Sequence, residues 1–131
     1  RDFLVARDNI TTLLSYHTFS ELILYPWGHT YDSIENQTDL QIHAAMAQAM
    51  GQMTGYMPQQ SSDLYITSGD TTDWAYGELG IYSFTIELFP KSLMDGGFYP
   101  SARHIEEVVN LNIPAALYLI EYADNPIRAL W

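Results

Sequence analysis

The chain has 131 residues, the length of a single domain, and 47% of them are hydrophobic, which suffices for a packed core and is unlike a disordered chain. Its net charge of −11, with only five Lys and Arg, argues against nucleic acid or an anionic membrane surface as a partner and favours the approach of cationic substrates. The absence of cysteine excludes disulfides and thiolate metal sites, and no apolar run approaches the roughly 18 residues of a membrane span.

The first part of the chain predicts the end of a helix followed by two strands. Residues 2–9 are expected to form the last helical turns, and residues 10–16 and 20–25 to form strands, because their β-branched and apolar residues are near-continuous. Such strands are typical of a sheet that is covered on both faces. Arg1 and the lack of a signal peptide suggest a start that is processed, excised or truncated.

A helix is expected next, at about 38–54, because its apolar residues follow helical rather than alternating spacing. Gly55 is expected to end it. Two histidines are expected at the surface of this region: His43, on the polar side of the helix, and His29, in the polar loop before it.

The second half predicts a short strand near 63–67, a short helix from about 70 to 76, a buried strand at 81–88 and a final helix at 101–123. Pro114 should kink or split that last helix. Its buried stripe is expected to consist of Ile105, Val108, Val109, Ile113, Leu117 and Ile120. The alternation of helices and strands predicts an α/β fold with a mixed sheet.

Two residues at strand ends are candidates for chemistry. Glu87 lies in an otherwise apolar strand with no basic residue nearby in sequence, so it is either partnered in the core or a general base whose pKa is raised by burial. His17 ends an apolar strand where the chain turns, a place where α/β sheets carry functional groups. Packing is the alternative reading for His17, with no ligand role.

Two weaker candidates have structural readings that we prefer. His104 and Glu107 have a spacing that can chelate zinc, yet they occupy the first turns of an amphipathic helix, where a solvated face is the simpler interpretation. Tyr65 precedes a glycine-containing loop and could swing over a site, although ordinary strand packing is the simpler interpretation.

Three segments together resemble the zinc metallocarboxypeptidases of the carboxypeptidase A type. Segment 17–28, HTFSELILYPWG, is similar to the family's His-Ser-Tyr-Ser-x-Leu-x-Leu-Tyr-Pro-x-Gly segment. Segment 69–77, GDTTDWAYG, resembles its specificity loop and Asp-Trp-x-Tyr helix, and segment 82–88, YSFTIEL, resembles the strand that carries its catalytic glutamate. The likeness runs through nearly the whole chain and looks closest to the bacterial carboxypeptidase T branch.

The resemblance implies a role for each matching residue. His17 would be the third protein ligand of zinc, and Glu87 the general base that takes a proton from the zinc-bound water and passes it to the leaving amine. Tyr65 would fold over the substrate's terminal carboxylate. Thr18 and Phe19 would line the subsite beside the zinc, with a non-proline cis peptide between them.

The resemblance also implies a pocket for the C-terminal side chain, lined by Leu24, Gly28, Leu64, Asp70, Thr72 and Thr85. Basic-specific relatives have an aspartate, and apolar-specific ones an aliphatic residue, where this chain has Thr72. Asp70 offers a carboxylate from another side, so we expect a mixed preference for apolar and basic C-terminal residues.

The family's first two zinc ligands, an upstream His-x-x-Glu, and its substrate-clamping arginines do not occur in this chain. We therefore expect residues 1–131 to be the C-terminal half of a peptidase domain, which binds zinc weakly or not at all and is inactive alone. The parent enzyme would act on peptide C-termini and, by family resemblance, be secreted or periplasmic.

The strand at 10–16 would form a bare sheet edge, and such an edge recruits a partner. Two partners are possible: the N-terminal half of the same enzyme, or a second copy of this chain. The alternative function is a non-catalytic binding or assembly module that keeps the carboxypeptidase scaffold. An unrelated α/β domain with chance matches is the third reading.

Overall fold

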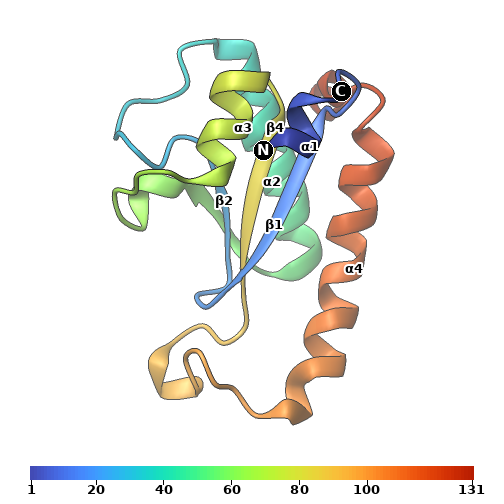
Figure 1. Cartoon of the computed structure of the whole chain (residues 1–131). Helices are drawn as coiled ribbons and strands as arrows, with labels where there is room; N and C mark the ends of the chain where they lie inside the picture. Colours follow the sequence, from blue (N-terminus) through green and yellow to red (C-terminus); the bar gives the residue numbers. More distant parts are fainter.

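A four-stranded mixed sheet organises residues 1–131, all of which the computed structural model describes (Figure 1). Its strands run in the order β1-β4-β2-β3, with β1 parallel to β4, β2 antiparallel to β4, and β3 parallel to β2. They are β1 (Thr12–Thr18), β2 (Leu22–Tyr25), β3 (Met57–Gln60) and β4 (Tyr82–Leu88). The predicted α/β class, about four strands flanked by helices, is confirmed.

Four α-helices accompany the sheet: α1 (Asp2–Val5), α2 (Gln37–Thr54), α3 (Thr71–Leu79) and α4 (Ile105–Tyr122). Short 3-10 turns lie at Ser61–Asp63, Leu93–Asp95, Ala102–His104 and Pro126–Leu130. The predicted end of α2 is confirmed, because Gly55 takes the left-handed conformation (φ 76°) that glycine adopts without steric cost. No helix is both long and apolar enough to span a membrane.

Two predicted boundaries are wrong. The strand expected near 63–67 is displaced: β3 comes earlier, and a 3-10 turn and a loop follow it, because Ser61 and Asp63 favour turns over a ladder. The first helix is a single short turn, since the chain leaves it at Ala6 and reaches β1 only at Thr12.

The core lies on the face of the sheet that α2 and α4 cover. Side chains alternate along β4, so Phe84 and Ile86 point into this core while Ser83, Thr85 and Glu87 point to the other face. α3 packs on that second face, where the Ser83 hydroxyl donates to the Thr72 carbonyl. In Figure 1, α3 lies in front of the sheet and α2 behind it.

His43 is buried, which corrects the prediction that it lies on the surface. Its ring packs against Tyr76, Tyr82 and Phe84. Nδ1 donates to the Asp39 carbonyl at 2.9 Å, and Nε2 accepts from the Ser83 amide at 3.4 Å. A histidine whose two nitrogens both find partners is accommodated as a neutral core residue.

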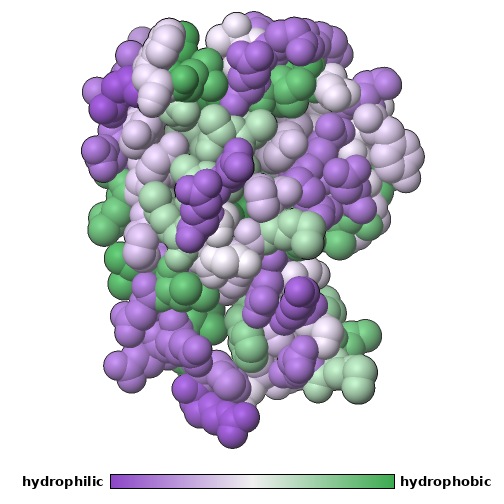
Figure 2. Space-filling model, turned by 180° about the vertical axis from the view of Figure 1, so that it is seen from behind, coloured by the Kyte–Doolittle hydropathy of each residue, from purple (hydrophilic) through white to green (hydrophobic).

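The stripe predicted to be buried on α4 is largely exposed, and in the view from behind green surface interrupts the purple along the side that α4 forms (Figure 2). Only Val108 of its six residues is partly buried, and the residues of α4 that are fully buried are Asn112, Ala115 and Leu119. The reason is that α4 carries apolar residues on two neighbouring faces, of which α2 and the sheet cover one. Pro114 lies inside α4 without splitting it.

Candidate active site

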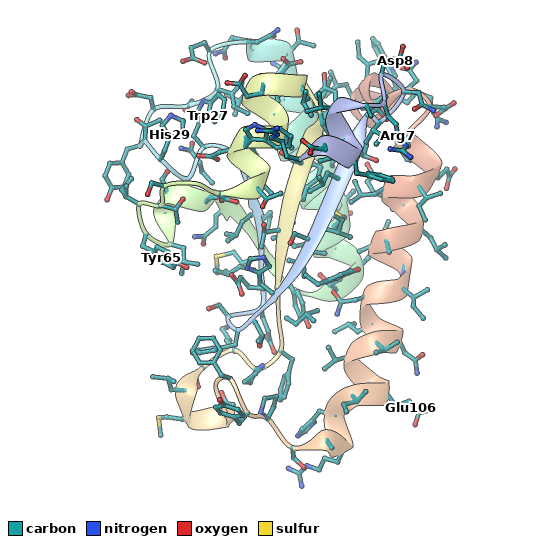
Figure 3. The ribbon with its side chains drawn as sticks, in the orientation of Figure 1. Arg7, Asp8, Trp27, His29, Tyr65 and Glu106 are labelled. Atoms are coloured by element: carbon teal, nitrogen blue, oxygen red, sulfur yellow. The ribbon has the colours of Figure 1, made fainter.

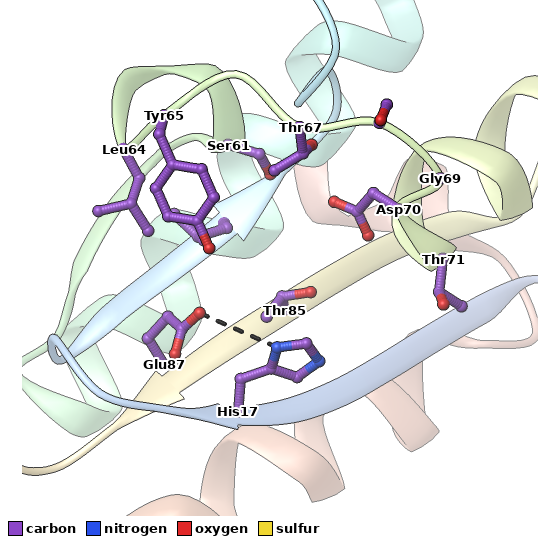
Figure 4. Close-up of a pocket in the computed structure, with 12 residues that line it drawn as sticks. His17, Ser61, Leu64, Tyr65, Thr67, Gly69, Asp70, Thr71, Thr85 and Glu87 are labelled. Atoms are coloured by element: carbon purple, nitrogen blue, oxygen red, sulfur yellow. Dashed lines mark ion pairs between the residues drawn. The ribbon is translucent and has the colours of Figure 1, made fainter. Parts of the chain in front are cut away.

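A cavity of about 250 Å³ opens on the α3 face of the sheet and gathers most of the predicted site residues (Figure 4). β1 contributes His17, β2 contributes Leu24, and β4 contributes Thr85 and Glu87. The loop before α3 closes the far side with Leu64, Tyr65 and Asp70. Residues separated by up to 70 positions in the chain therefore meet because parallel strand β1 lies beside β4.

His17 and Glu87 are direct partners in the β1–β4 ladder. Their side chains therefore leave the sheet on the same face, and His17 Nδ1 lies 4.0 Å from Glu87 Oε1. His17 Nε2 is hydrogen-bonded to Ser15 Oγ at 3.1 Å, which leaves Nδ1 as the nitrogen turned towards Glu87. An imidazole nitrogen and a carboxylate oxygen thus face each other across a gap.

Glu87 is held in an environment that disfavours its charge. The residue is 7% exposed, and its Oε2 atom has no hydrogen-bond partner. Burial raises the pKa of the Glu87 carboxyl, and the nearby His17 opposes that rise only in part. A carboxylate whose pKa is raised by burial and which keeps one oxygen free of hydrogen bonds is suited to accepting and returning a proton.

The two carboxylate oxygens of Asp70 have different surroundings at the rim of the cavity. Its Oδ1 accepts from the Thr72 amide at 2.9 Å and so caps α3, while its Oδ2 remains turned towards Gly28. A Cβ at Gly28 would lie 2.5 Å from Thr67 Oγ1, so only glycine fits between these side chains. One oxygen of Asp70 is therefore structural, and the other is available at the cavity wall.

Tyr65 forms the outer wall of the cavity. It is 61% exposed, follows the Ser61–Asp63 turn and lies on the side of the molecule away from α4 (Figure 3). Figure 4 shows its hydroxyl directed into the cavity, above Glu87. An aromatic side chain that is partly exposed and lies on a loop can cover a molecule bound in the cavity.

Four predicted site residues are not among those that line the cavity. Thr72 is fully buried behind the wall, because α3 turns it towards β4. Gly28 lies just outside, with its amide held by Asp73 at 2.8 Å. Thr18 and Phe19 lie past the end of the cavity, joined by a cis peptide bond, and Phe19 packs edge-on against Phe98 at 5.0 Å.

The structure adds lining residues that the sequence did not indicate, namely Ser61, Thr67, Ser68, Gly69 and Thr71. The signal was present in the run of small polar residues before α3, since such runs form loops and loops carry function. The sequence-based prediction missed these residues because it assigned Tyr65 and its neighbours to a strand. Thr67 is notable because its hydroxyl is buried without a hydrogen-bond partner.

A zinc ion would find one suitable ligand here. That ligand is the free Nδ1 of His17, and the unpartnered Oε2 of Glu87 belongs to the same cavity. However, no group of three His, Cys, Asp or Glu that could hold a metal occurs in the structure. His104 and Glu107, 3.7 Å apart, are remote from the cavity, so a zinc site that used His17 would need ligands from outside this chain.

Comparison with known proteins identifies the family. The family model described as zinc carboxypeptidase matches residues 1–115. A zinc carboxypeptidase of Saccharothrix mutabilis subsp. capreolus is 40% identical over 118 residues, which cover 88% of this chain and 27% of that protein. Bovine carboxypeptidase A1 is 36% identical over 91 residues, which cover 66% of this chain and 22% of that protein.

Solved structures agree with this assignment. Bovine thrombin-activatable fibrinolysis inhibitor, in complex with tick carboxypeptidase inhibitor, matches 94% of this chain with a TM-score of 0.81 and 26% identity. The match covers 43% of that structure, and the chain spans about a quarter of the first curated relatives. With its fold, its cavity and these matches taken together, the chain belongs to the zinc carboxypeptidase family and covers part of that fold.

Proposed function

We propose that this chain is the C-terminal half of the peptidase domain of a secreted zinc carboxypeptidase, one that releases apolar and basic C-terminal residues from peptides. The single observation that carries the proposal is the convergence of His17, Tyr65, Asp70 and Glu87 on one cavity. The motifs favour the bacterial carboxypeptidase T branch as the nearest one within the family. Metal ligands and carboxylate-clamping arginines would come from the rest of the enzyme.

The proposed chemistry of Glu87 follows from its surroundings. When bound, zinc would acidify a water molecule and polarise the scissile carbonyl, and His17 Nδ1 would be one of its ligands. Glu87, whose pKa is raised by burial, accepts a proton from the attacking water and returns it to the leaving amine. Such general-base assistance typically contributes about 10²–10⁴-fold to the rate.

The proposed substrate preference follows from the cavity wall. Leu24 and Leu64 offer apolar contact to an aliphatic or aromatic side chain. The free Oδ2 of Asp70 offers an acceptor and a negative charge to a lysine or arginine side chain. Tyr65 closes over the bound residue from the solvent side.

A chimera tests the proposal, in which this chain replaces the matched 118 residues of the Saccharothrix enzyme. We expect zinc-dependent release of both C-terminal leucine and C-terminal arginine. Glu87→Gln should lower kcat about 10²-fold or more on both substrates, because it removes the base. Glu107→Gln, the same change at an exposed position on α4, serves as control and should have no effect.

Asp70→Asn in the same chimera tests the preference. The amide oxygen still caps α3, so stability should be kept while the charge is lost. We expect kcat/KM for C-terminal arginine to fall about tenfold, with leucine release unchanged. Equal effects on the two substrates would remove Asp70 from the proposed specificity role, and a folded, zinc-loaded chimera without peptidase activity would refute the proposed function.

A further inference from the structure

Ser15 and His17 project from the same face of β1, because side chains alternate along a strand and residues two apart share a face. Ser15 Oγ lies 3.1 Å from His17 Nε2, within hydrogen-bond distance. The opposite nitrogen of the ring, Nδ1, is turned towards Glu87 (Figure 4). The imidazole is therefore placed between a serine hydroxyl on one side and a carboxylate on the other.

The contact with Ser15 is the one hydrogen bond that the His17 ring makes within the chain. The nearest Glu87 oxygen is 4.0 Å from Nδ1, which is beyond hydrogen-bond distance. The His17 side chain is also 56% exposed, and the ring torsion of a histidine has broad minima, so packing alone does not fix the ring. Without the hydroxyl, His17 would be free to turn Nδ1 away from the cavity.

Ser15 is suited to hold the ring because its own position is fixed. It lies in the middle of β1, is partly buried, and is the direct ladder partner of Thr85 in β4. A hydroxyl can accept from an N–H group or donate to a bare ring nitrogen. When Nδ1 serves as a metal ligand, the ring proton resides on Nε2, and Ser15 Oγ is then the acceptor.

We propose that Ser15 is the positioning residue of His17: it accepts the Nε2 proton and holds the imidazole so that the Nδ1 lone pair faces the cavity. The inference rests on the proposed function in taking zinc as the metal at Nδ1. Metal-ligating histidines donate their second N–H to an outer acceptor, and loss of that acceptor typically costs about 10–100-fold in metal affinity or activity. No carboxylate or backbone carbonyl of the chain bonds Nε2, so the hydroxyl has no substitute.

A purely structural role is the alternative for Ser15. Small polar residues that face each other across two strands, as Ser15 and Thr85 do, also stabilise a sheet. The two roles differ in what they require, since the positioning role needs the hydroxyl and the structural role needs only a side chain that fits the strand.

Ser15→Thr and Ser15→Val, made in the Saccharothrix chimera, separate these roles. Both side chains are β-branched and suit a strand, but only threonine keeps the hydroxyl. Competition with a chelator measures zinc affinity without a peptidase assay. We expect Ser15→Thr to stay within about twofold of the unsubstituted chimera and Ser15→Val to lose about tenfold or more. Ser33→Val, the same change at an exposed loop position, is the control and should alter zinc affinity less than about twofold.

The isolated chain provides a second measurement that needs no metal. NMR relaxation of the His17 Cε1–H group reports how tightly the ring is held in one orientation. We expect the order of the ring to be kept in Ser15→Thr and to fall in Ser15→Val. If Ser15→Val unfolds, Ser15→Ala replaces it, because alanine removes the hydroxyl without adding a methyl group.

Equal zinc affinities, or equal order of the His17 ring, in the threonine and valine variants would overturn the role of Ser15 and leave the proposed function standing. A folded chimera that binds no zinc would instead refute the proposed function, and the order of the ring in the isolated chain would still decide whether Ser15 positions His17.

Discussion

Glu87 and His43 are both shielded from water, but only Glu87 has a polar side-chain atom without a hydrogen-bond partner. His43 uses both ring nitrogens within the core, whereas Glu87 keeps an unpartnered oxygen at the cavity. Burial raises the pKa of Glu87 and lowers the pKa of His43 to about 4. The unsatisfied group is therefore the candidate for chemistry, and the satisfied one is a structural device.

His43 should make the fold sensitive to acid. The folded pKa of about 4 lies below the usual 6.5, so the unfolded chain takes up the proton first as pH falls. The free energy of unfolding should therefore decline between pH 6.5 and about 4, by about 3 kcal/mol in total, and be unaffected by His43 above that range. Urea denaturation at a series of pH values measures this decline.

His43→Gln is the reference for that experiment, because it removes the titrating ring and leaves the acidic residues in place. The difference in the free energy of unfolding between the original protein and His43→Gln should grow from pH 4 to pH 6.5 and then level off. Parallel stability profiles would show that His43 does not take part in the acid response.

The sequence could indicate His17 and Glu87 because each interrupts an apolar strand. It could not place His43, since a histidine on a helix has the same local pattern whether solvent or a tyrosine cluster surrounds it. Thr72 and Thr71 show the same limit: adjacent residues at the start of α3 differ in whether they face the sheet or the cavity. That choice depends on the angle at which α3 meets β4.

The helices begin and end where local chemistry stops the backbone from continuing. Asn36 Oδ1 accepts from the amides of Thr38 and Asp39 at the start of α2, and Gly55 ends that helix. Signals of this kind are local, so the sequence predicted the bounds of α2 closely. The apolar pattern of α4 also predicted a helix correctly, but a pattern cannot tell which of two apolar faces the rest of the protein will cover.

Removing the cap of α2 should weaken the fold measurably. We expect Asn36→Ala to lower the free energy of unfolding by about 1 kcal/mol, because two amides lose their shared acceptor. Asn36→Asp keeps an acceptor beside the positive end of the helix and should retain most of the stability. Urea midpoints at constant m-value compare the variants, and equal midpoints for Ala and Asp would argue that water replaces the cap.

The molecule as a whole covers part of the zinc carboxypeptidase fold, and its four-stranded sheet has β1 and β3 at its edges. The edge position of the His17 strand was within reach of the sequence, because the strand expected at 10–16 was expected to form a bare edge of the sheet. The exposure of the apolar stripe on α4 was not, because its spacing along the helix is the same whether or not another element covers it.

The isolated chain should bind zinc poorly, because a catalytic zinc requires three protein ligands and the cavity offers only the imidazole of His17. We expect no stoichiometric zinc to remain after gel filtration, as measured by atomic absorption, and no change in zinc content on His17→Ala. One equivalent of zinc that His17→Ala removes would contradict this expectation and would require a site assembled within these residues.

The ladder pairing of His17 with Glu87 has an evolutionary consequence. Their separation is fixed by the alignment of two parallel strands and not by the side chains themselves. Point substitutions around the cavity can adjust its selectivity while this alignment persists. Insertion or deletion of a single residue within β1 or β4 would turn one of the two groups to the opposite face of the sheet, so these strands should tolerate drift in composition but not in length.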